Sequence, residues 1–171
     1  VAPVRKSLGV RNFFNVLGPL VNPVQPEFQM LGVYNLAMLR LYTYIYQEEN
    51  KKFSIVHSMD GYDEVSLTSQ FKVTSNNGEH LFMPEDLGFK TIAQNELYGG
   101  ETQEEAATIF RNVLNASATD AQMNVVIVNA ALGIQTIDQH KSIEECIDIA
   151  RDALYSKKAL KVLQTFVEIN S

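Results

Sequence analysis

Three carboxylates stand close together in the turn Ser58-Met-Asp-Gly-Tyr-Asp-Glu64, at Asp60, Asp63 and Glu64. Carboxylates grouped on one loop suit Mg²⁺, which proteins usually hold through one or two carboxylates together with the phosphates of a substrate. The spacing is not that of a calcium loop, because it contains no D-x-D-x-D-G ladder. From composition alone, a solvated acidic turn that bends at Asp60-Gly61 explains the same residues at least as well.

The opening of the chain carries the opposite charge. Arg5, Lys6 and Arg11 precede the first acid, Glu27, in a chain with 14 Lys and Arg against 20 Asp and Glu and a formal net charge of -6. An Arg-bearing, acid-free segment punctuated by Gly and Pro is a candidate anion site. The alternative from charge alone is the solvated face of an amphipathic helix.

The histidines and the cysteine do not suggest a further metal site or a nucleophile. His57, His80 and His140 are too scattered in sequence for a metal triad, and a hydrogen bond at the end of a strand is the expected state of His57. Cys146 is the single cysteine, so no intrachain disulfide can form. Helical spacing places it on an apolar face, which predicts a buried structural thiol rather than a nucleophile.

Two further polar features are predicted to be structural. Gly99-Gly100 precedes a helix start and superficially resembles a phosphate cradle, but Glu101 beside it would repel a phosphate, so we interpret it as a helix entry. Asn124 and Asn129 lie on a mostly apolar helix. A buried Asn there is expected to bond with the backbone of a loop.

The elements that position the acidic turn follow from hydrophobic periodicity. An apolar strand at residues 29–34, a helix from Asn35 to about Glu49 and a second strand at residues 52–57 make a βαβ unit. The two strands are therefore expected to be parallel. The acidic turn then lies at the carboxyl end of the second strand, where open α/β sheets bind their ligands.

The rest of the chain predicts a β-hairpin followed by helices. Alternating residues at 71–74, the positive-φ sequence Asn76-Asn77-Gly78 and a return at 80–83 are typical of an antiparallel pair. Capping-box patterns begin helices near Thr102 and Ser142, and Thr119 or Asp120 caps a helix between them. A last helix is expected from about Ser156 to Glu168. The fold class is α/β: part of a mostly parallel sheet with a hairpin extension, flanked by helices.

Composition sets limits on the class of protein. The chain has 171 residues and is 46% hydrophobic, enough for one sizeable core, and no linker or repeat divides it. No apolar run approaches the length of a membrane span, and the acidic balance argues against a general nucleic-acid binder. We therefore expect no membrane partner and no nucleic-acid partner. A single cysteine fits a cytoplasmic location.

The segment from Arg5 to Pro23, R-K-x-L-G-V-R-x-x-F-N-x-L-G-P-L-x-N-P, closely resembles the anthranilate phosphoribosyltransferase family of the nucleoside phosphorylase/phosphoribosyltransferase superfamily. The turn from His57 to Glu64, H-x-x-D-G-x-D-E, is similar to the family's metal-binding turn. Together these motifs reverse the composition-based preference for an ordinary solvated turn. The resemblance implies transfer of a phosphoribosyl group from phosphoribosyl pyrophosphate to anthranilate, with release of pyrophosphate, in tryptophan biosynthesis.

The resemblance also implies residue roles. Asp63 and Glu64 would hold the Mg²⁺ that accompanies the pyrophosphate, while Asp60 would shape the turn. Arg5 would bind the carboxylate of anthranilate, a pairing that suits a planar guanidinium. Gly18 and Pro19 would line the anthranilate tunnel. No residue of this chain is expected to act as a covalent catalyst.

The family's Gly-Thr-Gly-Gly-Asp loop and Lys-His-Gly-Asn segment, which bind phosphoribosyl pyrophosphate, do not occur in these 171 residues. We therefore expect residues 1–171 to be one domain, the C-terminal part of the larger α/β catalytic domain, and to be inactive alone. The N-terminal helical domain would then be absent, and with it the contacts of a homodimer. Two alternatives remain: an enzyme like the pyrimidine nucleoside phosphorylases, and a non-catalytic relative that binds nucleic acid.

Overall fold

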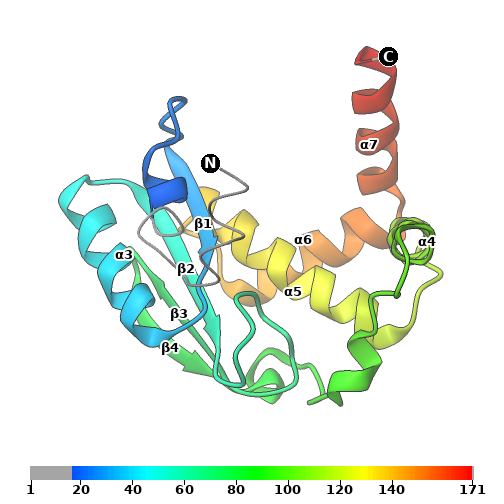
Figure 1. Cartoon of the computed structure of the whole chain (residues 1–171), viewed down its shortest axis with the longest axis horizontal. Helices are drawn as coiled ribbons and strands as arrows, with labels where there is room; N and C mark the ends of the chain where they lie inside the picture. The colour runs from blue at the N-terminus through cyan, green and yellow to red at the C-terminus, as the bar shows by residue number, and fades with distance from the viewer. Residues whose placement is uncertain (1–16, 171) are drawn as a thin grey trace, which may run out of the picture.

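In the computed structural model, which describes residues 17–170, a four-stranded sheet carries helices on both faces (Figure 1). The strands are β1 (Phe28–Gly32), β2 (Lys52–Ser58), β3 (Phe71–Ser75) and β4 (Gly78–Phe82). The α-helices are α3 (Leu36–Glu48), α4 (Gln103–Leu114), α5 (Asp120–Ile137), α6 (Ile143–Tyr155) and α7 (Lys158–Ile169). The short 3-10 helices are η1 (Gly18–Leu20), η2 (Pro84–Leu87) and η3 (Gln94–Leu97). No helix among the described residues is long and apolar enough to cross a membrane.

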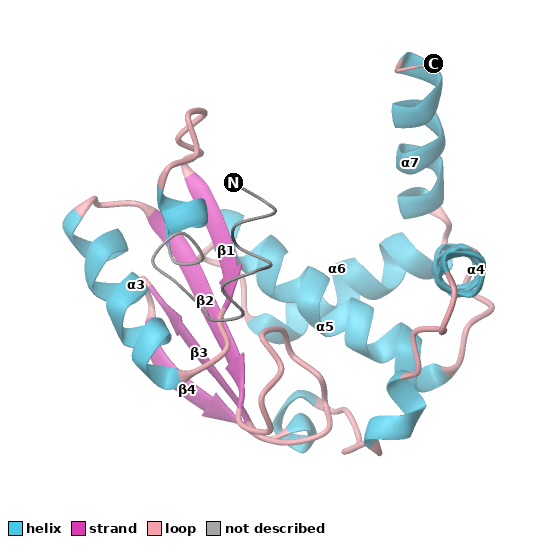
Figure 2. Ribbon diagram, viewed as in Figure 1, coloured by secondary structure: helices cyan, strands magenta, loops and turns pink. Residues whose placement is uncertain are grey.

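The strands lie side by side in chain order, β1-β2-β3-β4 (Figure 2). β1 and β2 are parallel, with Leu31 opposite Ile55, and α3 forms the crossover between them. β3 and β4 extend the sheet as an antiparallel hairpin whose turn lies at Ser75–Gly78. The predicted α/β class, βαβ unit and hairpin are confirmed. Within the described residues, the parallel part of the sheet is the β1–β2 pair.

Alternation along β2 divides the interior into two cores. Phe53 and Ile55 face α3 and pack with Leu39 and Tyr46. Val56 faces the opposite side and joins the larger core beneath α5 and α6. Ser54 faces the same side, where its hydroxyl accepts a hydrogen bond from Thr136 Oγ1 of α5 at 2.8 Å. β2 is thus covered on both faces, as is typical of a strand in a parallel α/β sheet.

The helix starts follow local capping chemistry. Asn35 caps α3 by accepting from Met38 N at 2.9 Å. The Thr119/Gln122 and Ser142/Glu145 pairs form capping boxes at α5 and α6. At α4, Thr102 Oγ1 accepts from Glu105 N at 3.2 Å, and the Glu105 carboxylate accepts from Glu101 N, one residue before the cap, at 2.7 Å. α7 begins after Lys157, whose positive φ of 61° marks a sharp break from α6.

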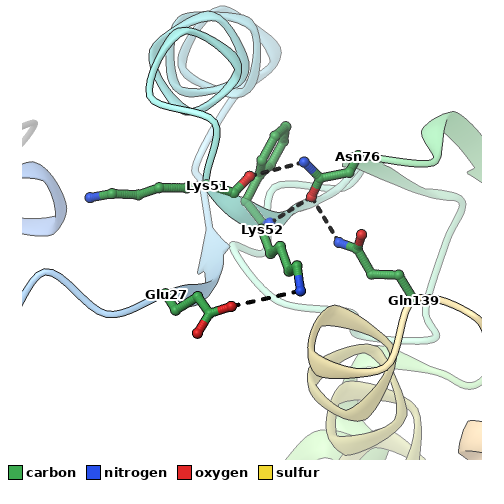
Figure 3. A network of polar contacts seen from close by, with 6 residues as sticks. Glu27, Lys51, Lys52, Asn76 and Gln139 are labelled. Carbon is green, nitrogen blue, oxygen red and sulfur yellow. Dashed lines mark hydrogen bonds and ion pairs between the residues drawn. The ribbon is translucent and has the colours of Figure 1, made fainter.

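A polar network closes the amino end of β2 (Figure 3). The Asn76 side chain accepts from Phe53 N and from Gln139 Nε2, both at 2.8 Å, and donates to Lys51 O at 2.9 Å. It thereby joins the hairpin turn, β2 and the segment after α5. The nearby Lys52–Glu27 pair, at 3.7 Å, is largely exposed and adds little stability. The network belongs to the scaffold, since it lies at the opposite end of β2 from the acidic turn.

α7 projects away from the sheet and keeps an apolar face exposed (Figure 1). Val162, Phe166 and Ile169 are 70%, 65% and 77% exposed. Phe110 of α4 is also exposed. The outer edge of β1 pairs with no other strand among the described residues. An unpaired edge and an exposed apolar patch are therefore both present.

Tyr46 provides a test of the smaller core. Its ring is 1% exposed and stacks on Phe53, but its hydroxyl is buried without a hydrogen-bond partner in the described chain. Replacing Tyr46 by Phe removes this unsatisfied group and keeps the ring. We expect the free energy of unfolding at pH 7 to rise by about 1 kcal/mol in urea titrations. The matched control is Tyr44→Phe, since Tyr44 is exposed.

The same substitution has a pH signature. Burial, with smaller contributions from Glu49 and Tyr42, raises the pKa of Tyr46 to about 12. The folded state therefore holds this proton more tightly than the unfolded state, in which the pKa of a tyrosine has its ordinary value of 10.0. Stability should fall as pH rises from 10 toward 12, and this fall should be smaller in the Tyr46→Phe variant. A variant that is less stable at pH 7 would show that the hydroxyl has a partner.

Candidate functional site

The acidic turn leaves β2 at its carboxyl end and closes on itself. Ser58 N donates to Tyr62 O at 2.9 Å, and Met59 N donates to Gln70 O at 2.8 Å where the chain returns to β3. The Asp60 carboxylate accepts a hydrogen bond from Thr68 Oγ1 across the loop. Asp60 is therefore engaged within the turn, in agreement with its predicted shaping role.

Asp63 and Glu64 differ from Asp60. Both side chains are exposed, and neither carboxylate has a hydrogen bond or ion pair with any residue in the described part of the chain. In this part of the chain no group of three or more His, Cys, Asp or Glu side chains gathers around a common point. Two adjacent free carboxylates without a cage fit Mg²⁺ better than a structural metal, because Mg²⁺ retains water and takes further oxygens from substrate phosphates.

The backbone that carries these carboxylates is held by Ser58. Its hydroxyl donates to Glu64 O at 2.7 Å and accepts from Ser66 N at 3.2 Å. Val65, Ser66 and Leu67 are at most 1% exposed although they belong to no strand. The two exposed acids are therefore followed directly by a buried segment that is hydrogen-bonded to β2.

Gly32 allows the turn to approach β1 closely. A Cβ atom placed on Gly32 would lie 2.7 Å from Asp63 O and 2.9 Å from Asp63 C. Both are backbone atoms, so a larger residue could not be accommodated by moving a flexible side chain. Gly32 thus sets the distance between the end of β1 and the turn, a role that periodicity did not reveal.

His57 lies outside this arrangement. It is 6% exposed, and its Nδ1 lies 2.7 Å from Val33 O. The ring therefore ties the end of β2 to the segment after β1. The expected hydrogen-bonded strand-end histidine is confirmed.

The predicted anthranilate residues are only partly described. Arg5, like Arg11, lies outside the described residues. Gly18 and Pro19 begin η1, and Pro19 O accepts from Gln29 Nε2 at 3.1 Å. Gln29, which binds Pro19, and Gly32, which lies beside Asp63, are about 10 Å apart along β1. Pro19 and Asp63 therefore contact opposite ends of this strand. The described contacts do not bring Gly18 and Pro19 together with the acidic turn.

A cavity of about 240 Å³ borders the acidic turn on the side of α4 and α5. Glu64 and Ser66 contribute to its rim, and most of its wall is apolar. The wall residues are Leu97, Ile109, Val113, Val125 and Val126. Such a wall cannot pair with the oxygens of a diphosphate.

The start of α4 is already occupied by its own carboxylate. Glu105 accepts from Glu101 N at 2.7 Å and from Tyr98 Oη at 3.2 Å, and these hydrogen bonds lower the pKa of Glu105. Gly100 has a φ of +90°, and a Cβ on it would lie 2.8 Å from Glu105 Cβ. The geometry agrees with the predicted helix entry and leaves no place for a phosphate at this helix end.

Comparison with known proteins places this site in a family. The sequence model of the glycosyl transferase family, a/b domain, matches residues 1–160. The chain belongs to this family. Within it, the chain is 56% identical over 171 residues to an anthranilate phosphoribosyltransferase of Bacteroides thetaiotaomicron, and 58% identical over 170 residues to one of Bacteroides fragilis. It covers 52% and 51% of these relatives, so it spans about half the length of the curated proteins it matches.

Solved structures give the same result. The anthranilate phosphoribosyltransferase of Thermus thermophilus superimposes with a TM-score of 0.87 at 31% identity, over 98% of this chain and 50% of that one. The enzyme of Saccharomyces cerevisiae, in complex with PRPP and Mg, superimposes with a TM-score of 0.84 at 25% identity, over 98% of this chain and 48% of that one. The resemblance inferred from the two motifs is confirmed.

Replacing Gly32 by Ala tests how the turn is seated. Because the added methyl would strike the backbone of Asp63, we expect the turn to shift and the free energy of unfolding to fall by about 1–3 kcal/mol. In ¹H–¹⁵N spectra the largest amide shifts should lie at Tyr62–Val65. Gly99→Ala is the control, since a Cβ there meets nothing within 4 Å. Shifts confined to β1 itself would contradict the proposed contact.

Proposed function

We propose that this chain works as part of an anthranilate phosphoribosyltransferase, which transfers a phosphoribosyl group from phosphoribosyl pyrophosphate to the amine of anthranilate and releases pyrophosphate. The proposal rests chiefly on Asp63 and Glu64, an adjacent pair of carboxylates at the carboxyl end of a parallel strand that have no hydrogen bond or ion pair with residues 17–170. The likeness to enzymes of this name over the whole chain supports it.

Electrostatics explains why an acidic turn serves a polyanionic substrate. Two ionised carboxylates repel a pyrophosphate, so the turn can receive one only with a divalent cation between them. Asp63 and Glu64 would hold Mg²⁺, which supplies charge neutralisation for the leaving pyrophosphate. Because both carboxylates would bind the ion, replacing either acid by a neutral residue is expected to weaken Mg²⁺ binding.

The acceptor requires the opposite charge. Arg5 would bind the carboxylate of anthranilate through two parallel hydrogen bonds, which also fixes the orientation of the ring. Gly18 and Pro19 would line the tunnel through which anthranilate enters. Positioning and charge stabilisation suffice for this transfer, and no covalent nucleophile is needed. Cys146 is unsuited to such a role, since it is fully buried and burial raises the pKa of its thiol.

The remaining features of the proposal concern the whole protein. Residues 1–171 would form the C-terminal part of the α/β catalytic domain, joined to a helical domain that carries the contacts of a homodimer. The coverage of about half of each relative leaves room for such a domain. A cytoplasmic location belongs to the same proposal.

The first test measures the loss of anthranilate fluorescence in the presence of phosphoribosyl pyrophosphate and Mg²⁺. The assay uses a full-length protein that contains these 171 residues and is as long as the relatives. We expect Mg²⁺-dependent loss there and none with the 171-residue chain alone. Turnover of thymidine with inorganic phosphate would instead indicate a nucleoside phosphorylase. A salt-dependent gel shift without turnover would indicate a nucleic-acid-binding relative.

The metal assignment is tested in the same polypeptide by Asp63→Asn and Glu64→Gln. Each replacement removes one negative charge while keeping the size of the side chain. We expect the Mg²⁺ concentration for half-maximal rate to rise at least about tenfold and kcat to fall. Glu144→Gln is the control, because Glu144 is an exposed acid on α6. An unchanged Mg²⁺ dependence in both turn variants would remove this pair from the metal site.

A further inference from the structure

The two proposed metal ligands need a fixed backbone, although their side chains are exposed. Residues 64–66 lie outside every strand, so no sheet ladder pairs their peptide groups. Buried peptide groups still require partners, since an unsatisfied one is costly. The residues that supply these partners therefore determine where the turn sits.

Asn129 supplies two of them. Its Oδ1 accepts from Val65 N at 3.1 Å, and its Nδ2 donates to Val65 O at 2.8 Å. The second Nδ2 hydrogen is directed to Val125 O of its own helix at 2.9 Å. The amide thus binds both backbone groups of the residue that follows Glu64, across 64 positions of sequence. The expectation that a central-helix Asn bonds with a loop backbone is confirmed.

Ser58 completes the arrangement from the other side. Because its hydroxyl binds Glu64 O and Ser66 N, the four consecutive groups Glu64 O, Val65 N, Val65 O and Ser66 N are all held by two side chains. Ser58 belongs to β2, whereas Asn129 belongs to α5. The turn is therefore fixed to the sheet and to the helix layer at once.

α5 is a rigid base for this contact. Val128, Ala131 and Leu132, which flank Asn129 along the helix, are 0%, 0% and 1% exposed. A side chain on a packed helix holds its partners more accurately than one on a loop. An amide carries its donor and its acceptor on two separate atoms, so it can bind the N–H and the C=O of one residue at the same time without adding charge beside the two acids.

We propose that Asn129 is a positioning residue for the metal-binding turn: it holds Val65 so that the Asp63 and Glu64 carboxylates are presented to the same cation. This inference rests on the proposed metal role of Asp63 and Glu64. Asn129 touches neither the metal nor a substrate and acts through the backbone. Its replacement should weaken metal binding while the exposed carboxylates themselves remain in the protein.

The test uses the ¹⁵N-labelled 171-residue chain with Mn²⁺ as a paramagnetic probe for the Mg²⁺ site. Oxygen ligands that suit Mg²⁺ also suit Mn²⁺. Increasing Mn²⁺ should broaden the amide signals of Asp63, Glu64 and Val65 first. In Asn129→Ala and Asn129→Leu, the same broadening should need about tenfold more Mn²⁺, the usual effect of losing an outer-shell partner.

Matched controls lie on the same helix. Asn124→Ala and Asn124→Leu make the same changes at a half-buried Asn of α5 whose side chain has no hydrogen bond with described residues. These variants should titrate like the original chain. Asn129→Leu keeps the number and branching of the side-chain heavy atoms, so it removes the hydrogen bonds without leaving the cavity that Ala would leave.

The outcomes separate the two proposals. If the original chain shows no selective broadening at Asp63 and Glu64, the metal assignment fails, and the role of Asn129 fails with it. If the original chain binds Mn²⁺ there and a folded Asn129 variant titrates identically, the metal assignment stands and the positioning role is overturned. Equal weakening by the Asn124 variants would also overturn it, because the effect would then belong to the helix rather than to the amide.

Discussion

The structure depends on one constraint: a buried segment that is not a strand must still satisfy its peptide groups. Val65, Ser66 and Leu67 are essentially inaccessible to solvent. Burial of the Val65 and Leu67 side chains is favourable, but it also removes the polar backbone groups of this segment from water. Side chains take the place of a ladder, with Ser58 and Asn129 binding residues 64–66. Leu67, at a φ of 60°, leaves its carbonyl to accept from Ile92 N at 3.0 Å. The acidic turn is ordered because it adjoins this segment.

α5 connects that segment to the sheet. Thr136 binds Ser54 near the amino end of β2, and Asn129 binds Val65 beyond its carboxyl end. Seven residues of helix separate the two contacts, a length of about 10 Å. A shift of α5 along its axis would break one contact or strain the other. Helix, strand and turn are therefore held in one register, and Gly32 completes it by admitting the turn close to β1.

Local signals predicted most of the fold. The periods of β2 and α3, the Asn76-Asn77-Gly78 turn and the caps at Asn35, Thr119 and Ser142 each act within a few residues, so the sequence displays them directly. The motifs predicted Asp63 and Glu64. Two features were beyond sequence reasoning: the partner of Asn129 lies 64 positions away, and the constraint on Gly32 comes from a different loop. Tertiary packing decides both.

In the proposed function, charge explains why an acidic turn and a basic opening segment would serve the same reaction. The chain carries a formal charge of -6, so its overall field opposes anionic substrates, and binding them requires local cations. In the proposed function, a divalent ion held by Asp63 and Glu64 would meet this need for a pyrophosphate, whose oxygens bind metal ions readily. A carboxylate on an aromatic ring is better held by a guanidinium, whose paired donors fix the plane of the ligand. The opening segment offers such a group in Arg5, before the first acid of the chain. Under the proposed function, two anionic reactants of different shape would thus require two different cations: a divalent ion held by the acidic turn, and a guanidinium from the opening segment.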